Sequence, residues 1–210
     1  MNAPEVIGVA AVIVSVLVAS WRLYTKPRLN VYWDPSRTGE RVRTSLGEMR
    51  LPGIGKTKVF DMAAWFHVQV RNLGGRPAHH CSGFIDSVEV LEDGQFQPHA
   101  EFRGRLRLPW ANTGGEVEAT LQPSEHPTHR LDVFYAVERV QWFHLPVAGG
   151  HGCRTEFPKG TYRLTVTVES PDAASSSCRL LVDYQRDWDH IDIKQTPLSS
   201  FVSVQESVQG

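Results

Sequence analysis

The stretch GTYRLTVTVES, residues 160–170, decides the fold class of this chain of 210 residues. Its apolar side chains alternate strictly with polar ones: Tyr162, Leu164, Val166 and Val168 against Arg163, Thr165, Thr167 and Glu169. Successive side chains of a strand point to opposite faces of a sheet. A period of two therefore predicts a β-strand with one face in a core and the other in water.

The same alternation occurs in shorter stretches along the chain. It involves Leu29, Val31 and Trp33; Phe66, Val68 and Val70; Leu131, Val133 and Tyr135, which the pattern places on one face; and Leu180 with Val182. Thirteen prolines and seventeen glycines punctuate these stretches and leave little length for helices. About seven to nine short strands with frequent turns are typical of an antiparallel β-sandwich of the immunoglobulin-like kind. We expect this domain over residues 28–193, followed by a polar tail over residues 194–210.

Residues 1–27 differ from the rest. From Val6 to Ala19 the chain reads VIGVAAVIVSVLVA, and to Leu23 the apolar segment has about 18 residues, or about 27 Å of helix, enough to cross hydrocarbon. A cleaved secretory signal would need a basic leader, but the leader MNAPE has none. A buried core helix would need a polar face. The segment therefore predicts an uncleaved transmembrane anchor, with Trp21 and Tyr24 at the interface.

Charge around this segment predicts the topology. Arginine and lysine gather after it, at positions Arg22, Lys26, Arg28, Arg37, Arg41 and Arg43. The cytoplasmic side of a membrane keeps such an excess. We expect a single-pass protein of the cell (inner) membrane, with its N-terminus outside and its domain in the cytoplasm. An odd number of cysteines, Cys81, Cys153 and Cys178, and the lack of an Asn-x-Ser/Thr sequon agree with that.

One segment carries a family resemblance. FHVQVRNLGGRPAHHC, residues 66–81, resembles the hairpin V-x-N-x-G-x-x-x-A of CARDB-like and related immunoglobulin-like bacterial domains, and GTYRLTVTV, residues 160–168, is similar to their penultimate strand. The resemblance implies a β-sandwich in which two strands flank the Asn-x-Gly turn, and a role as a binding or spacer module. Such domains commonly lie outside the cytoplasm, in conflict with the topology that the charges predict.

Signatures of chemistry are weak. LPGIGKT, residues 51–57, ends like a phosphate-binding loop, but Arg50 stands where that loop needs glycine.

Histidine and cysteine gather at residues 79–81, at His126 with His129, and at His151 with Cys153, the best partial pair for zinc. If His79 and His80 are neighbours in a strand, their side chains should point to opposite faces of the sheet. The acidic run at residues 187–192 lacks the spacing of a calcium loop. No metal, cofactor or catalytic constellation is predicted.

Three arginines form the most suggestive pattern. EFRGRLRL, residues 101–108, would place Arg103, Arg105 and Arg107 on one face of a strand, with Trp110 as an apolar wall beside them. Guanidinium groups bind phosphates and carboxylates, so this face could bind an anionic ligand or lipid headgroup. The alternative is a solvated strand face whose arginines pair with nearby acids.

These observations favour a non-catalytic binding module held at the membrane, with a protein partner or a second copy of the chain as its target. A net charge of −1 argues against nucleic acid. The alternative function is a ligand-sensing membrane effector, for example in bacterial stress or antiphage defence, that recognises an anionic small molecule. An enzyme with a dispersed site is the third hypothesis.

Overall fold

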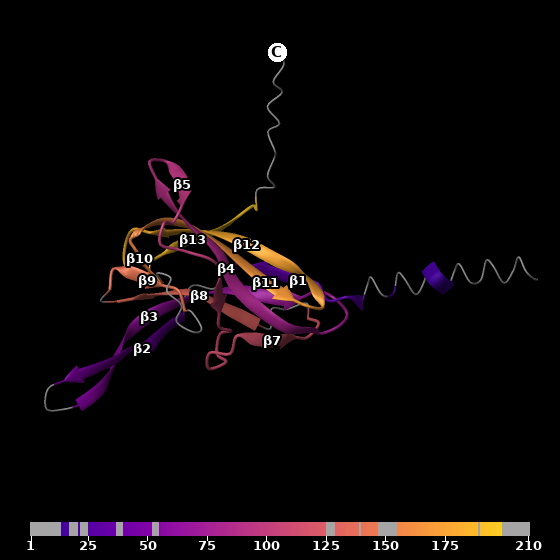
Figure 1. Cartoon of the computed structure of the whole chain (residues 1–210), viewed down its shortest axis with the longest axis horizontal. Coiled ribbons are helices and arrows are strands. Elements are labelled where there is room, and N and C mark those ends of the chain that lie inside the picture. Colours follow the sequence, from indigo (N-terminus) through magenta and orange to yellow (C-terminus); the bar gives the residue numbers. More distant parts are fainter. Residues whose placement is uncertain are drawn as a thin grey trace, which may run out of the picture.

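The structure, a computed structural model, describes residues 14–16, 21, 25–36, 40–51, 55–124, 129–138, 140–146, 155–188 and 190–198, and only the backbone of 40–51 and 55–60. Its described part holds thirteen strands in two antiparallel sheets, so the all-β, sandwich-like architecture is confirmed (Figure 1). The first sheet contains β1 (Leu29–Tyr32), β2 (Glu40–Leu51), β3 (Gly55–Asn72), β8 (His129–Val137), β9 (Trp142–His144) and β10 (Glu156–Pro158). The second contains β4 (Ala78–Glu92), β5 (Gln95–Pro98), β6 (Leu106–Leu108), β7 (Glu118–Leu121), β11 (Gly160–Ser170), β12 (Ala173–Tyr184) and β13 (Asp192–Thr196).

Two long strands, β3 in the first sheet and β4 in the second, pair with most of the other strands. In the first sheet the order is β1-β3-β8-β9-β10, and β2 also pairs with β3. In the second the order is β13-β12-β11-β4-β5, and β6 and β7 also pair with β4. Strand β4 therefore has β11 along one edge and three short strands along the other. The β2–β3 ribbon projects from the sandwich at the lower left of Figure 1, because β8 pairs with β3 only from Ala63 onward.

The core lies between the two sheets, where the period of two predicted it. Tyr162, Leu164, Val166 and Val168 of β11 are at most 2% exposed, and Phe66, Val68 and Val70 of β3 are likewise buried. The sheets approach closely at Gly83 of β4, where an added Cβ would overlap the methyl groups of Leu131. At about 25 cal/mol per Å² of apolar surface, this burial is the main term that favours folding.

A β-bulge corrects one expectation about faces. Phe66 pairs with Phe134, but Val68 pairs with Leu131, so β8 contains one extra residue between them. Phe134 stacks on Phe66 in the core at 4.6 Å, and Tyr135 stacks on Trp65 on the outer face at 4.4 Å. Leu131 and Tyr135 therefore do not share a face, because a bulge shifts the alternation by one residue.

The Asn-x-Gly turn joins the two sheets and does not close a hairpin. Asn72 ends β3 in the first sheet, and β4 begins the second sheet. The Asn72 side chain is completely buried. Its Oδ1 accepts hydrogen bonds from the backbone N–H groups of Arg28 and Gly74, both at 2.9 Å. Its Nδ2 donates to the carbonyls of Arg76 (2.6 Å) and Leu121 (3.1 Å). This amide fixes the crossing because it satisfies four backbone groups, of which the Gly74 N–H and the Leu121 carbonyl meet it in buried hydrogen bonds.

The two ends of the chain are described only in part. Most of the predicted anchor from Val6 to Leu23 lies outside the described residues, and no helix among those described is long and apolar enough to cross a membrane. At the other end, β13 pairs with β12 through Thr196, three residues into the predicted tail. Residues 199–210 lie outside the description.

Candidate binding site

The arginine segment does not form the continuous strand that its sequence predicts. Strand β6 contains only Leu106–Leu108. Gly104 has φ +84°, a left-handed conformation that breaks the extended backbone between Arg103 and Arg105. The regular alternation that would align three guanidinium groups on one face is therefore lost.

Arg105 lies across the outer face of the second sheet. Its Nη1 and Nη2 donate to both carboxylate oxygens of Glu169 on β11, at 2.9 and 2.8 Å, and its Nε donates to Asp86 on β4 at 2.5 Å. The guanidinium carbon lies 3.8 Å from the centre of the Phe84 ring. The hydrogen bonds from Arg105 lower the pKa of Glu169, and they raise the pKa of Arg105 itself. This side chain ties β6 to β4 and β11.

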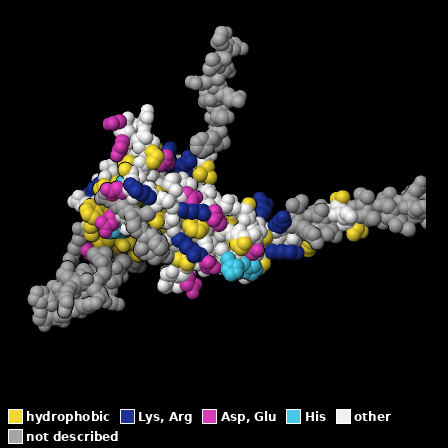
Figure 2. Space-filling model, in the orientation of Figure 1, with side chains coloured by type: hydrophobic (Ala, Val, Ile, Leu, Met, Phe, Trp, Pro, Cys, Tyr) yellow, Lys and Arg dark blue, Asp and Glu magenta, His cyan; other side chains and the backbone are white. Residues whose placement is uncertain are grey.

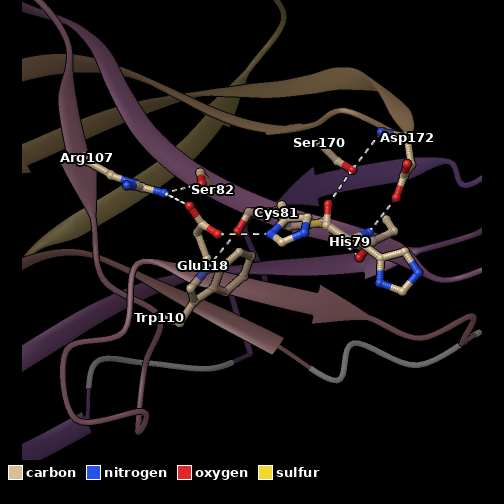
Figure 3. A network of polar contacts seen from close by, with 10 residues as sticks. His79, Cys81, Ser82, Arg107, Trp110, Glu118, Ser170 and Asp172 are labelled. Carbon is tan, nitrogen blue, oxygen red and sulfur yellow. Dashed lines mark hydrogen bonds and ion pairs between the residues drawn. The ribbon is translucent and has the colours of Figure 1, made fainter.

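Arg107 binds a second set of acceptors (Figure 3). Its Nη2 donates to the Ser82 hydroxyl and to a carboxylate oxygen of Glu118, both at 2.7 Å. The other oxygen of Glu118 lies 3.1 Å from Nδ1 of His80. The hydrogen bonds from Arg107, and secondarily from His80, lower the pKa of Glu118. Glu118 therefore links β7 to both β6 and β4.

The prediction that His79 and His80 point to opposite faces of the sheet is wrong. Both side chains are exposed. Strand β4 shifts register against β7 between Ala78 and Cys81, and His80 has φ +49°. The backbone N–H of His79 donates to Asp172 at 3.0 Å, and its carbonyl accepts from the Ser170 hydroxyl at 2.8 Å (Figure 3). The bulge thus turns both imidazoles to solvent, and contacts from the β11–β12 turn hold it.

An open hollow of about 470 Å³ lies beside this bulge. Three strands and the turn between β11 and β12 supply its lining, which includes His80, Ser82 and Phe84 from β4, Glu169 and Ser170 from β11, Pro171 from the turn, and Ser175 from β12. Glu169 is held by Arg105 and Ser82 by Arg107, so the arginines fix side chains of its lining. The hollow combines one aromatic ring with hydroxyls, a carboxylate and an imidazole, a lining suited to a polar ligand or a protein segment.

Trp110 is not a wall of this site. Its ring is 1% exposed, and its Nε1–H donates to the backbone carbonyl of Cys81 at 3.2 Å. It therefore belongs to the core under β4, on the opposite side of the sheet from the hollow.

Metal-binding groups are only partly described. No cluster of three or more His, Cys, Asp or Glu side chains that could hold a metal occurs within the described ranges. His126, His151 and Cys153 lie outside them. Cys81 and Cys178 are free and buried, and burial raises the pKa of both thiols, that of Cys178 to about 12. These two thiols stay protonated near neutral pH, so they are poor nucleophiles and metal ligands.

A second cluster, on the outer face of the first sheet, was missed by the sequence reasoning. Trp65, Tyr135 and His144 stack in one row across β3, β8 and β9, with ring centroids 4.4 and 5.0 Å apart. Glu156 on β10 continues the row, 3.8 Å from His144. Burial lowers the pKa of His144 and raises that of Tyr135. The row depends on strand register and on the β8 bulge, and neither is visible in the sequence.

Comparison with known proteins adds no relative. No family model, no curated protein and no solved structure matches this chain significantly.

Proposed function

We propose that this chain is a membrane-anchored, non-catalytic binding module that binds a protein partner through the hollow beside His80. The observation that carries the proposal is this open hollow of about 470 Å³, which combines the Phe84 ring with polar groups on the outer face of a sheet. One partly exposed aromatic side chain beside hydrogen-bonding groups is a combination found in protein interfaces.

Preorganised side chains favour binding at this place. Arg105 and Arg107 hold Glu169 and Ser82 through hydrogen bonds of 2.7–2.9 Å, so these lining groups lose little conformational freedom when a partner docks. In the alternative function, the sensing of an anionic small molecule, the anion would have to displace Glu169 or Glu118 from these guanidinium groups. The pairing of Arg105 and Arg107 with carboxylates therefore favours the binding module over the sensing of an anion.

The anchor is the second part of the proposal. The segment from Val6 to Leu23 crosses the cell (inner) membrane with the N-terminus outside, and the immunoglobulin-like domain lies in the cytoplasm. Its length, its apolar composition and the basic residues that follow it support this arrangement. At its end the Thr25 hydroxyl donates to the Trp21 carbonyl at 2.8 Å, a side-chain contact to the residue four positions earlier that occurs in helices.

Site-specific photo-crosslinking of the full-length chain in cells tests the hollow. A crosslinker at Ser175, which lines the hollow, should give one discrete adduct, and Ala173→Arg beside it should abolish that adduct. The matched control is a crosslinker at Gln97, an exposed position on β5. An adduct with a second copy of the chain would identify a homo-oligomer as the partner. Equal adducts from both positions would overturn the hollow as the binding site.

Carbonate extraction tests the anchor separately. The intact chain should stay in the membrane pellet, because a transmembrane helix is held by its apolar surface and not by charge. Release of the intact chain, or a mature N-terminus after Ala19, would overturn the anchor.

A further inference from the structure

The connection between the predicted anchor and the domain is short and fixed. Helical structure reaches Thr25, and the backbone N–H of Arg28 already donates to Asn72 Oδ1 at 2.9 Å. The Arg28 carbonyl accepts from the Leu73 N–H at 2.7 Å. Only Lys26 and Pro27 separate the helix from hydrogen bonds to the domain. A connection of two residues, one of them proline, cannot act as a flexible linker.

Close backbone packing holds this connection against the turn that follows β3. An added Cβ at Gly74 would overlap the carbonyl oxygen of Lys26 and lie 2.6 Å from Cα of Pro27. An added Cβ at Gly75 would lie 3.3 Å from Cα of Thr25. The turn therefore lies directly beside the point where the helix ends.

The surface around that point is basic and apolar. Lys26, Arg28 and Arg76 are exposed, and the side chain of Leu73 is 44% exposed. Lys and Arg side chains gather at the end of the domain from which the N-terminal segment leaves (Figure 2). Exposed cations next to a helix end attract anionic lipids, and an exposed leucine can enter the headgroup layer.

We propose that these four residues, Lys26, Arg28, Leu73 and Arg76, form a headgroup-binding surface that seats the domain on anionic phospholipids. This inference rests on the proposed anchor, which brings the surface to the bilayer. The Asn72 and Gly74 contacts fix its orientation, so the domain stands on the membrane by this end. The arginines singled out by the sequence for lipid, Arg105 and Arg107, instead pair with carboxylates.

Cysteine accessibility of the full-length chain in nanodiscs tests the surface. In a Cys153→Ser background, Leu73→Cys should react with a water-soluble maleimide about fivefold more slowly in discs that contain phosphatidylglycerol than in pure phosphatidylcholine discs, and high salt should remove the difference. The matched control is Leu91→Cys, since Leu91 is 40% exposed on the β4–β5 hairpin. It should react equally in both discs.

Charge variants decide whether headgroup recognition causes the protection. Replacing Lys26, Arg28 and Arg76 together by Gln should abolish it, whereas Arg186→Gln, an exposed position just after β12, should leave it unchanged. Equal reactivity of the Leu73→Cys chain in both discs, or protection that survives the triple change, would overturn the surface while the anchor stands. Loss of the chain from the discs would overturn the anchor itself.

Discussion

Two polar regions of this domain stabilise it in different ways, one through buried neutral hydrogen bonds and the other through partly exposed ion pairs. At the Asn72 turn, one neutral amide is completely buried and makes four hydrogen bonds to backbone groups. On the outer face of the second sheet, charged pairs such as Arg105 with Glu169 and Arg163 with Glu89 lie partly in water. The charged face is the more conspicuous in the sequence, but the buried amide should contribute more free energy.

The reason is the cost of an unmade hydrogen bond. A buried N–H or C=O group that loses its partner retains the full cost of leaving water, about 1–3 kcal/mol. An exposed ion pair that loses one member is rehydrated, so its net contribution is usually below about 1 kcal/mol. Three predictions test this comparison, in order of decreasing effect.

Replacing Asn72 by Ala should lower the free energy of unfolding by about 3 kcal/mol, because it leaves the N–H groups of Arg28 and Gly74 and two carbonyls without their partner. Chemical denaturation of the full-length chain in detergent measures the change. The matched control is Leu73→Ala, an exposed neighbour that should change stability by less than about 0.5 kcal/mol. Equal effects of the two substitutions would contradict the role given to the buried amide.

A double-mutant cycle on Arg163 and Glu89 should give a coupling energy of about 0.5–1 kcal/mol. Their Nε–Oε2 and Nη2–Oε1 distances are 2.6 and 2.7 Å, and Arg163 also covers the Phe96 ring at 4.4 Å. The pair is partly solvated, which limits its contribution. A coupling as large as the Asn72→Ala effect would remove the distinction between the two regions.

The contribution of the Arg163–Glu89 pair to stability should depend only weakly on pH, and it should decrease as the pH falls. The hydrogen bond from Arg163 lowers the pKa of Glu89 below its ordinary 4.5. A lowered carboxylate pKa contributes stability above pH 4.5 that is lost as the pH falls through the folded-state value. The parent chain should therefore lose its advantage over Glu89→Gln as denaturation is measured at decreasing pH from about 6 to 3. An advantage that grows on acidification would contradict this pairing.

The candidate site shows where sequence reasoning stops. Gly104 interrupts the strand that the arginine alternation predicted. Arg105 pairs with Glu169 on β11, 64 residues along the chain, and Arg107 pairs with Glu118 on β7, 11 residues along the chain. Their partner acids could not be assigned without strand register. The hollow depends equally on the exposed His80, which is turned outward by a bulge that no local pattern signals.

The sequence by itself determined several of the strands, because the alternation of side chains is a local property of an extended backbone, and the faces of β3 and β11 follow from it. Only the tertiary structure decided where that alternation shifts, at the bulges in β8 and at His80, and which groups meet across strands. It also decided that Asn72, read as part of a hairpin, would hold the crossing between sheets and bind the residues that follow the predicted anchor. The physical reason is range: strand periodicity arises between neighbours, whereas bulges, ion pairs and buried hydrogen bonds depend on segments brought together by packing.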